Sequence, residues 1–125
     1  MKTALDVESY LFRLGLPFEP IAPEMWNVKT DHENLIVSVN GPLVIFRTKI
    51  MEVPTKAQEE FFELLLRANT TDLLHGAFGI EGGAVVLTSV LPLENLDWNE
   101  LSAVVDDFTM AIARLFPRLA PFRTA

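Results

Sequence analysis

The chain has 125 residues, half of them hydrophobic, with 17 acidic against 10 basic side chains. This length predicts a single domain over residues 1–125, and so apolar a composition argues against a disordered chain. The formal net charge of −7 argues against binding to nucleic acid, because phosphate contacts need clustered Lys and Arg. Since the chain has no cysteine, disulfides and thiolate metal sites are excluded.

The amino-terminal sequence does not resemble a secretory signal. Asp6 and Glu8 stand where a signal peptide would carry its apolar segment. No apolar run approaches the roughly 18 residues that a membrane span needs, and a run such as residues 84–87 has the length of a strand. We therefore expect a cytoplasmic protein that does not bind a membrane.

The first half of the chain is predicted to form a helix and then three strands. Apolar residues recur at spacings of three and four over residues 3–15, which is typical of a helix, and Gly15 and Pro17 are expected to end it. Residues 16–23 hold three prolines and are predicted to be an irregular connection. Alternating apolar residues predict strands around residues 25–30, 35–40 and 43–51. Their short turns force antiparallel pairing.

A second helix is predicted to start after Pro54, where Thr55 and Gln58 fit a capping box. Its core stripe is expected to consist of Phe61, Leu64, Leu65 and Ala68. Phe62 and Leu66 lie outside the centre of that stripe, so the apolar arc exceeds the roughly 100° that a surface helix needs. This surplus is the most informative physical feature of the sequence.

Two more strands, over residues 74–80 and 84–90, are predicted to form a hairpin through the turn at residues 81–83. A last helix over residues 97–115 is capped by Asp97, and Pro117 is expected to end it, leaving residues 117–125 as a short tail. The order helix, three strands, helix, two strands, helix predicts a two-layer α+β domain with an antiparallel sheet. Ile36 and Ile45 add apolar side chains to the second face of this sheet.

The residues typical of catalysis do not form a recognisable constellation. Two histidines exclude a site built from several His ligands. His32 is predicted to be a solvated turn residue and His75 an ordinary sheet-surface residue, because a catalytic base needs a positioned nucleophile and an orienting acid. Ser38 and Ser89 are candidate nucleophiles only in name, because no pattern in the sequence places either of them beside a base. An enzyme using Ser, Asp and His75 is therefore the least favoured hypothesis.

The acidic residues and glycines are better explained by structure than by chemistry. Asp106 and Asp107 are adjacent, point about 100° apart on a helix and are expected to lie on a solvated face. An acidic group near the last helix start is expected to cap that helix rather than bind calcium. Residues 79–83 lack the Lys and Ser or Thr of a phosphate-binding loop. Trp26 and Trp98 are predicted to pack in the core or at its seam. We predict no catalytic residue, no metal and no cofactor.

The apolar surplus predicts an interaction surface. One alternative is that the tail or residues 16–23 cover it within the chain. Otherwise it forms a homodimer interface or a docking surface for an apolar peptide.

Several segments together resemble a known family. The order of the elements is accompanied by residues 73–78, the Glu81-Gly82-Gly83 hairpin, residues 85–87, and Leu91-Pro92-Leu93 before Leu96-Asp97. Over nearly the whole chain this pattern resembles the type III secretion chaperone-like fold, which spans the Tir-chaperone (CesT) family and the related YbjN family. Met25-Trp26 and Gly41-Pro42-Leu43-Val44 look more like the YbjN side.

The resemblance implies a small acidic homodimer without enzymatic activity, which binds an apolar segment of a partner protein such as a secreted effector. By position, the residues it implies for the dimer interface are Phe62, Leu65, Leu66 and Asn69. Those it implies for partner binding are Ile36, Leu43 and Ile45. The alternative is a YbjN-like regulatory protein that binds a signalling partner or a small ligand.

Overall fold

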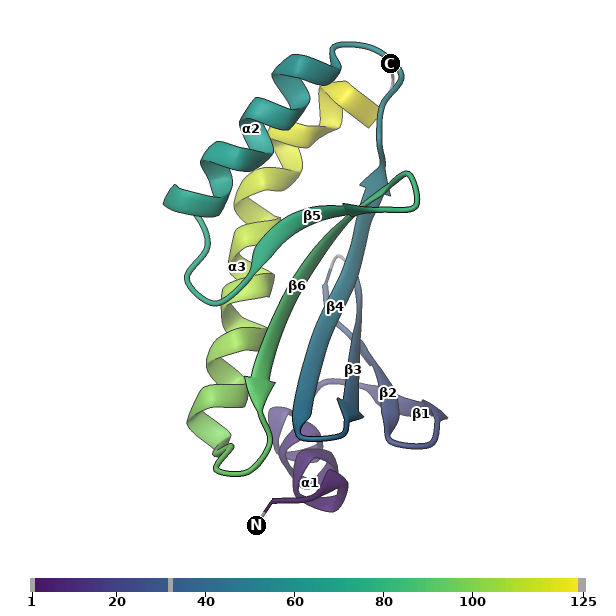
Figure 1. Ribbon diagram of the computed structural model, residues 1–125, viewed down its shortest axis with the longest axis vertical. Helices are drawn as coiled ribbons and strands as arrows, with labels where there is room; N and C mark the ends of the chain where they lie inside the picture. Colours follow the sequence, from purple (N-terminus) through teal and green to yellow (C-terminus); the bar gives the residue numbers. More distant parts are fainter. Residues whose placement is uncertain (1, 32, 124–125) are drawn as a thin grey trace.

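The computed structural model describes residues 2–31 and 33–123, so the prediction for His32 lies outside the described residues. The elements are α1 (Ala4–Leu14), β1 (Phe18–Ala22), β2 (Met25–Lys29), β3 (Asn34–Asn40), β4 (Leu43–Glu52), α2 (Gln58–Thr71), β5 (Ala77–Glu81), β6 (Ala84–Pro92) and α3 (Trp98–Arg123). The strands form one six-stranded antiparallel sheet in the order β1-β2-β3-β4-β6-β5. Helix α3 runs along the sheet, and α2 lies beside the C-terminal part of α3 (Figure 1). Helix α1 lies at the end of the sheet opposite α2. The predicted α+β class with an antiparallel sheet is confirmed.

A single core joins the three helices to one face of the sheet. On β4 the predicted alternation is confirmed, because Val44, Phe46, Thr48 and Ile50 are buried. Met51 is also buried, since the register shifts between Lys49 and Met51. The largest fully buried side chains are Phe46, Phe61, Leu11, Leu35, Leu87, Leu96, Leu101 and Leu115. Because α1, α2 and α3 all contribute to this cluster, the sheet has an inner face toward the helices and an outer face away from them.

The first helix begins with a cap that was not predicted from the sequence, and it ends at Gly15 as predicted. Thr3 and Asp6 form a capping box, in which the Thr3 backbone N–H donates to Asp6 Oδ2 at 2.8 Å. This backbone hydrogen bond lowers the pKa of the exposed Asp6 carboxyl below its ordinary value of 3.8. Gly15 ends the helix in the left-handed conformation, with φ of 77°.

Residues 16–23 are not an irregular connection, because Phe18–Ala22 forms strand β1. Strand β1 lies at one edge of the sheet and pairs only with β2. An edge strand tolerates proline because one side of its backbone needs no partner, and Pro20 is accommodated opposite Trp26. The pairing becomes irregular between Pro20 and Ala22, where the strand ends.

The start of α2 also differs from the prediction. The helix begins at Gln58, after Ala57 in a left-handed conformation with φ of 55°, and the proposed capping box with Thr55 is wrong. The Gln58 side chain instead donates to the carbonyl oxygen of Pro54 at 2.9 Å. The core stripe is confirmed, because Phe61, Leu65 and Ala68 are buried and Leu64 packs against the core.

Helix α3 does not end at Pro117 but continues to Arg123. A proline inside a helix costs a backbone hydrogen bond, so the last turns need other support. Leu119 is buried, the ring of Phe122 packs edge-on against Phe61 at 5.1 Å, and Arg123 Nη2 donates to the carbonyl oxygen of Ile50 at 3.2 Å. These contacts make residues 117–123 part of the fold rather than a tail.

Candidate functional site

The four residues predicted for a dimer interface line one groove between α2 and β5. The groove has a volume of about 320 Å³ and is formed by Phe62, Leu65, Leu66 and Asn69 of α2 together with Phe78, Gly79 and Ile80 of β5. Leu65 is buried, Phe62 is half-buried against Phe61, and the rim consists of Leu66, 68% exposed, and Ile80, 55% exposed. Of this lining, the residues of β5 were missed, because the pairing of α2 with β5 leaves no local sequence pattern.

Asn69 is the polar residue of this groove, and its side chain is already hydrogen-bonded. The Phe78 backbone N–H donates to Asn69 Oδ1 at 2.7 Å, and Asn69 Nδ2 donates to the Phe78 carbonyl oxygen at 3.4 Å. The amide is therefore satisfied within the chain. What the groove offers to another molecule is mainly apolar side-chain surface.

The three residues predicted to bind a partner share the outer face of the sheet. Leu43 and Ile45 are two residues apart on β4, and Ile36 lies diagonally across from Ile45, because it pairs with the next outward residue, Arg47. Leu43 is 40% exposed, while Ile36 and Ile45 are half-buried. Val90 of β6 stands directly opposite Ile45 and is 51% exposed, so it extends the same patch. The prediction missed Val90 because its place beside Ile45 depends on the pairing of β4 with β6, which are separated in the sequence by α2 and β5.

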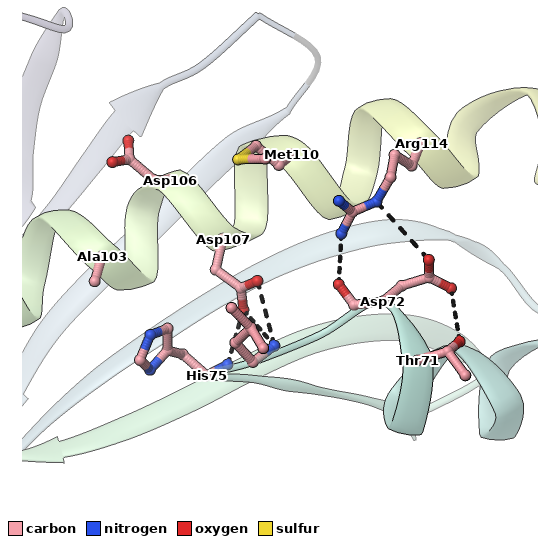
Figure 2. Close-up of a pocket in the computed structure, with 9 residues that line it drawn as sticks. Thr71, Asp72, His75, Ala103, Asp106, Asp107, Met110 and Arg114 are labelled. Atoms are coloured by element: carbon pink, nitrogen blue, oxygen red, sulfur yellow. Dashed lines mark hydrogen bonds and ion pairs between the residues drawn. The ribbon is translucent and has the colours of Figure 1, made fainter.

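A second hollow, of about 410 Å³, lies where the connector from α2 to β5 crosses α3 (Figure 2). Asp107 was expected on a solvated face, but it is only 7% exposed. Its carboxylate accepts hydrogen bonds from the backbone N–H groups of Leu74, at 3.1 Å, and His75, at 2.8 Å. Its neighbour Asp106 is exposed as predicted. The carboxylate thus holds the connector on α3, while the side chain of Leu74 is 85% exposed.

His75 lies in a bend before β5 rather than in the strand, and its side chain is exposed. Asp107 binds its backbone N–H, and the imidazole is directed away from that carboxylate (Figure 2). The Ser89 hydroxyl donates to the His75 carbonyl oxygen. The hydrogen bonds of Ser89 and Asp107 therefore go to the backbone of His75 and not to its imidazole. A catalytic base would need the imidazole itself between the nucleophile and the acid.

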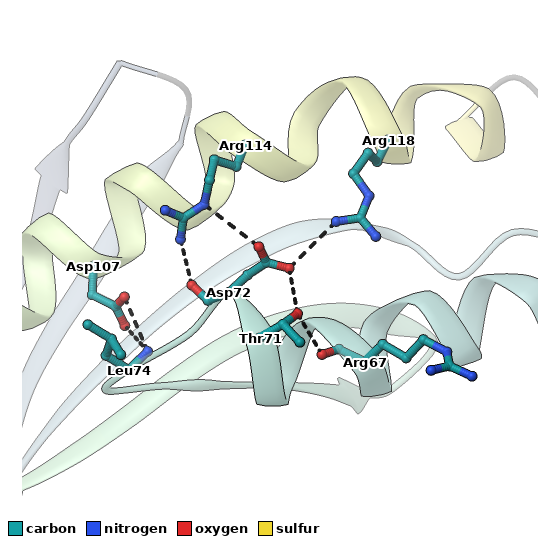
Figure 3. A network of polar contacts seen from close by, with 7 residues as sticks. All are labelled: Arg67, Thr71, Asp72, Leu74, Asp107, Arg114 and Arg118. Carbon is teal, nitrogen blue, oxygen red and sulfur yellow. Dashed lines mark hydrogen bonds and ion pairs between the residues drawn. The ribbon is translucent and has the colours of Figure 1, made fainter.

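Asp72 fastens the end of α2 to α3 (Figure 3). Its carboxylate lies 3.8 Å from Arg114 Nε and 3.5 Å from Arg118 Nη1, and Arg114 Nη2 donates to its carbonyl oxygen at 2.6 Å. These two arginines stand on either side of Pro117, so one carboxylate bridges the position where the helix lacks a backbone hydrogen bond.

Neither a cluster of metal ligands nor a helix able to cross a membrane is found among the described residues. Within residues 2–31 and 33–123, no three His, Asp or Glu side chains are grouped so that they could hold a metal ion. None of the helices described has both the length and the apolar character that crossing a membrane requires.

Both tryptophans are core or seam residues, as predicted. Trp26 is buried and donates from Nε1 to Glu8 Oε2 at 3.0 Å. Trp98 is half-buried and packs near Tyr10.

Several solved structures share this fold at low sequence identity. A chain of the heterodimeric ExoU–SpcU complex from the type III secretion system of Pseudomonas aeruginosa is 18% identical, with a TM-score of 0.75 over 92% of this chain and 98% of that chain. YbjN from E. coli is 14% identical, with a TM-score of 0.67 over 94% and 96% of the two chains. A chain of the complex between the Yersinia pestis type III secretion chaperone SycH and a fragment of YscM2 is 16% identical, with a TM-score of 0.64 over 88% and 97%.

Both sides of the predicted resemblance, secretion chaperones and YbjN, are thus represented among the similar folds. A comparison with curated protein sequences finds no match. The family model CesT_Tir_1, in contrast, matches residues 1–124. The chain therefore belongs to the CesT_Tir_1 family.

Proposed function

We propose that this chain is a non-enzymatic protein-binding module of the secretion-chaperone type, which forms a homodimer and holds an apolar segment of a partner protein. The observation that carries the proposal is that two apolar surfaces lie on different elements, the α2–β5 groove and the outer face of β3, β4 and β6. A dimer formed through the first leaves the second free. Membership of the family supports a protein-binding role, and a cytoplasmic location stays a prediction from the sequence.

The α2–β5 groove is the surface proposed for the dimer. A two-fold interface uses the same patch on both copies, so each exposed side chain on the rim counts twice. Burying an exposed Leu or Ile side chain stabilises a contact by roughly 1.5–3 kcal/mol. Leu66 and Ile80 of two copies therefore provide four such side chains around the floor formed by Leu65, with the Asn69 amide already satisfied.

The outer face is the surface proposed for the partner segment. Leu43, Ile45 and Val90 form a continuous apolar strip across β4 and β6, and Ile36 extends it onto β3. At the end of the strip Arg47 is already engaged in an ion pair with Glu81. The strip thus favours apolar side chains of a partner over charged ones.

The dimer is tested by Leu66→Asp, with Leu74→Asp as the matched control. Both leucines are largely exposed, at 68% and 85%, so neither substitution removes a core side chain. Phe62 is less suitable because it packs against Phe61 in the core. Burying an unpaired carboxylate at an interface costs several kcal/mol, so Leu66→Asp is expected to run as a monomer in sedimentation velocity while Leu74→Asp stays dimeric. A dimeric Leu66→Asp variant would contradict the choice of surface.

The partner surface is tested by co-purification with proteins encoded by neighbouring reading frames. Val90→Asp places a charge beside Ile45 and is expected to abolish binding of the partner, whereas Leu74→Asp is expected to leave it intact. Equal binding by Val90→Asp and the unmodified chain would show that the partner uses another surface.

A YbjN-like ligand-binding role is the second candidate, and the hollow beside α3 is the observation that favours it. Its volume of about 410 Å³ falls within the range of small-ligand sites, and Thr71, Asp106 and Arg114 offer polar groups. Native mass spectrometry of the purified protein tests this role. A retained ligand that is lost in Met110→Glu would support it, and a protein of unmodified mass would contradict it.

A further inference from the structure

Strand β5 lies at the edge of the sheet, so one side of its backbone has no neighbouring strand. In an antiparallel pair, alternate residues turn their N–H and C=O groups away from the neighbour. Both backbone groups of Phe78 bind Asn69 of α2, so Phe78 belongs to the outward-turned set, and Ile80, two residues later, shares its direction. An edge of this kind is normally a site where another strand can add.

Asn69 takes the place of a neighbouring strand at Phe78. Its Oδ1 accepts the Phe78 N–H at 2.7 Å and its Nδ2 donates to the Phe78 carbonyl oxygen at 3.4 Å. The carboxamide is the side chain that reproduces a peptide group, with one acceptor and a donor in the same plane. A carboxylate would accept the N–H but could not donate to the carbonyl.

We infer that Asn69 seals the free edge of β5 against an added strand. Within β5, Ile80 is then the one residue whose outward backbone groups remain open, and one residue cannot support a ladder of hydrogen bonds. A partner in the α2–β5 groove therefore binds through apolar side chains and does not continue the sheet. That consequence for the partner rests on the proposed dimer, whereas the sealing of the edge does not.

Amide hydrogen exchange tests the sealing in the full chain. In Asn69→Ala the Phe78 amide is expected to exchange on the order of tenfold faster than in the unmodified protein, because it loses its hydrogen-bond acceptor. Thr70→Ala is the matched control, since Thr70 is exposed and its hydroxyl donates only to the Arg67 carbonyl oxygen of its own helix. An unchanged rate for Phe78 in Asn69→Ala would overturn the inference.

The second readout is assembly, followed by light scattering and by the infrared signal of intermolecular strands. The freed edge of Asn69→Ala is expected to give concentration-dependent species larger than those of the unmodified protein. Faster exchange at Phe78 without such species would overturn the claim that Asn69 excludes a strand. Asn69→Asp keeps the acceptor but loses the donor, so the Phe78 amide is expected to exchange at a rate near that of the unmodified protein, while the freed Phe78 carbonyl gives an intermediate amount of the larger species. Failure of the dimer, in contrast, is seen in the mass of the unmodified protein.

Discussion

Replacing Asp107 by alanine measures how firmly the connector between α2 and β5 is held. The substitution removes an acceptor for the backbone N–H groups of Leu74 and His75. Hydrogen bonds to a charged group contribute about 1.5–3 kcal/mol each, and the lower end applies because water can reach an exposed connector. Two bonds then give about 3 kcal/mol, of which the better helix propensity of alanine returns about 0.5 kcal/mol. We expect the free energy of unfolding to fall by about 2.5 kcal/mol.

The assay is urea unfolding followed by circular dichroism, with Asp106→Ala as the matched control. Asp106 is the adjacent residue on the same helix but is exposed, so its replacement should change the free energy of unfolding by no more than about 0.5 kcal/mol. Asp107→Asn keeps one acceptor oxygen and is expected to fall between the two. If Asp107→Ala and Asp106→Ala agree within about 0.5 kcal/mol, the carboxylate does not hold the connector and the reasoning is refuted.

Three further predictions concern the same fold. Gly76→Ala is expected to destabilise the protein by about 1–3 kcal/mol in urea unfolding, because the new Cβ would lie 2.6 Å from Phe108 Cε1 and 2.8 Å from the Thr88 carbonyl oxygen. A loss below about 0.5 kcal/mol would show that the connector can move away from α3 and β6 at little cost in free energy. Asp72→Ala is expected to cost about 1 kcal/mol and to loosen the end of α3, seen as faster amide exchange after Pro117; unchanged exchange there would mean that the bridge to Arg114 and Arg118 is dispensable. The cap of α1 depends on ionised Asp6, whose pKa is lowered in the folded protein. Its contribution to stability is therefore present above the ordinary value of 3.8 and is lost as the pH falls through the folded pKa. Asp6→Asn should remove this part of the acid dependence of stability, and the same loss of stability with falling pH in Asp6→Asn and the unmodified protein would contradict the prediction.

The strongly periodic elements could be predicted because their burial follows from local spacing. The alternation on β4 and the stripe of α1 are examples, and the turn before Ala84 follows from two glycines with positive φ. Strand β1 could not be predicted, because it is mostly exposed and carries Pro20, so no alternation marks it. The continuation of α3 past Pro117 depends on contacts with residues far away in the sequence.

The candidate surfaces were predictable in part for the same reason. The wide apolar arc of α2 identified Phe62 and Leu66, which line one groove with Leu65 and Asn69. Their dimer role and the partner role of the outer face stay predictions. Val90 joins the outer face only through the pairing of β6 with β4, and Ile80 joins the groove only because β5 packs against α2. Asp106 and Asp107 are identical in chemistry and adjacent, so only the position of the connector decides that one is exposed and the other buried.

The proposed function requires a second copy of the chain to cover the apolar groove between α2 and β5. The most direct test is the molar mass of the unmodified protein, measured by light scattering on a size-exclusion column over a range of concentrations. We predict twice the chain mass of 14.0 kDa. A mass of one chain at every concentration would contradict the claim.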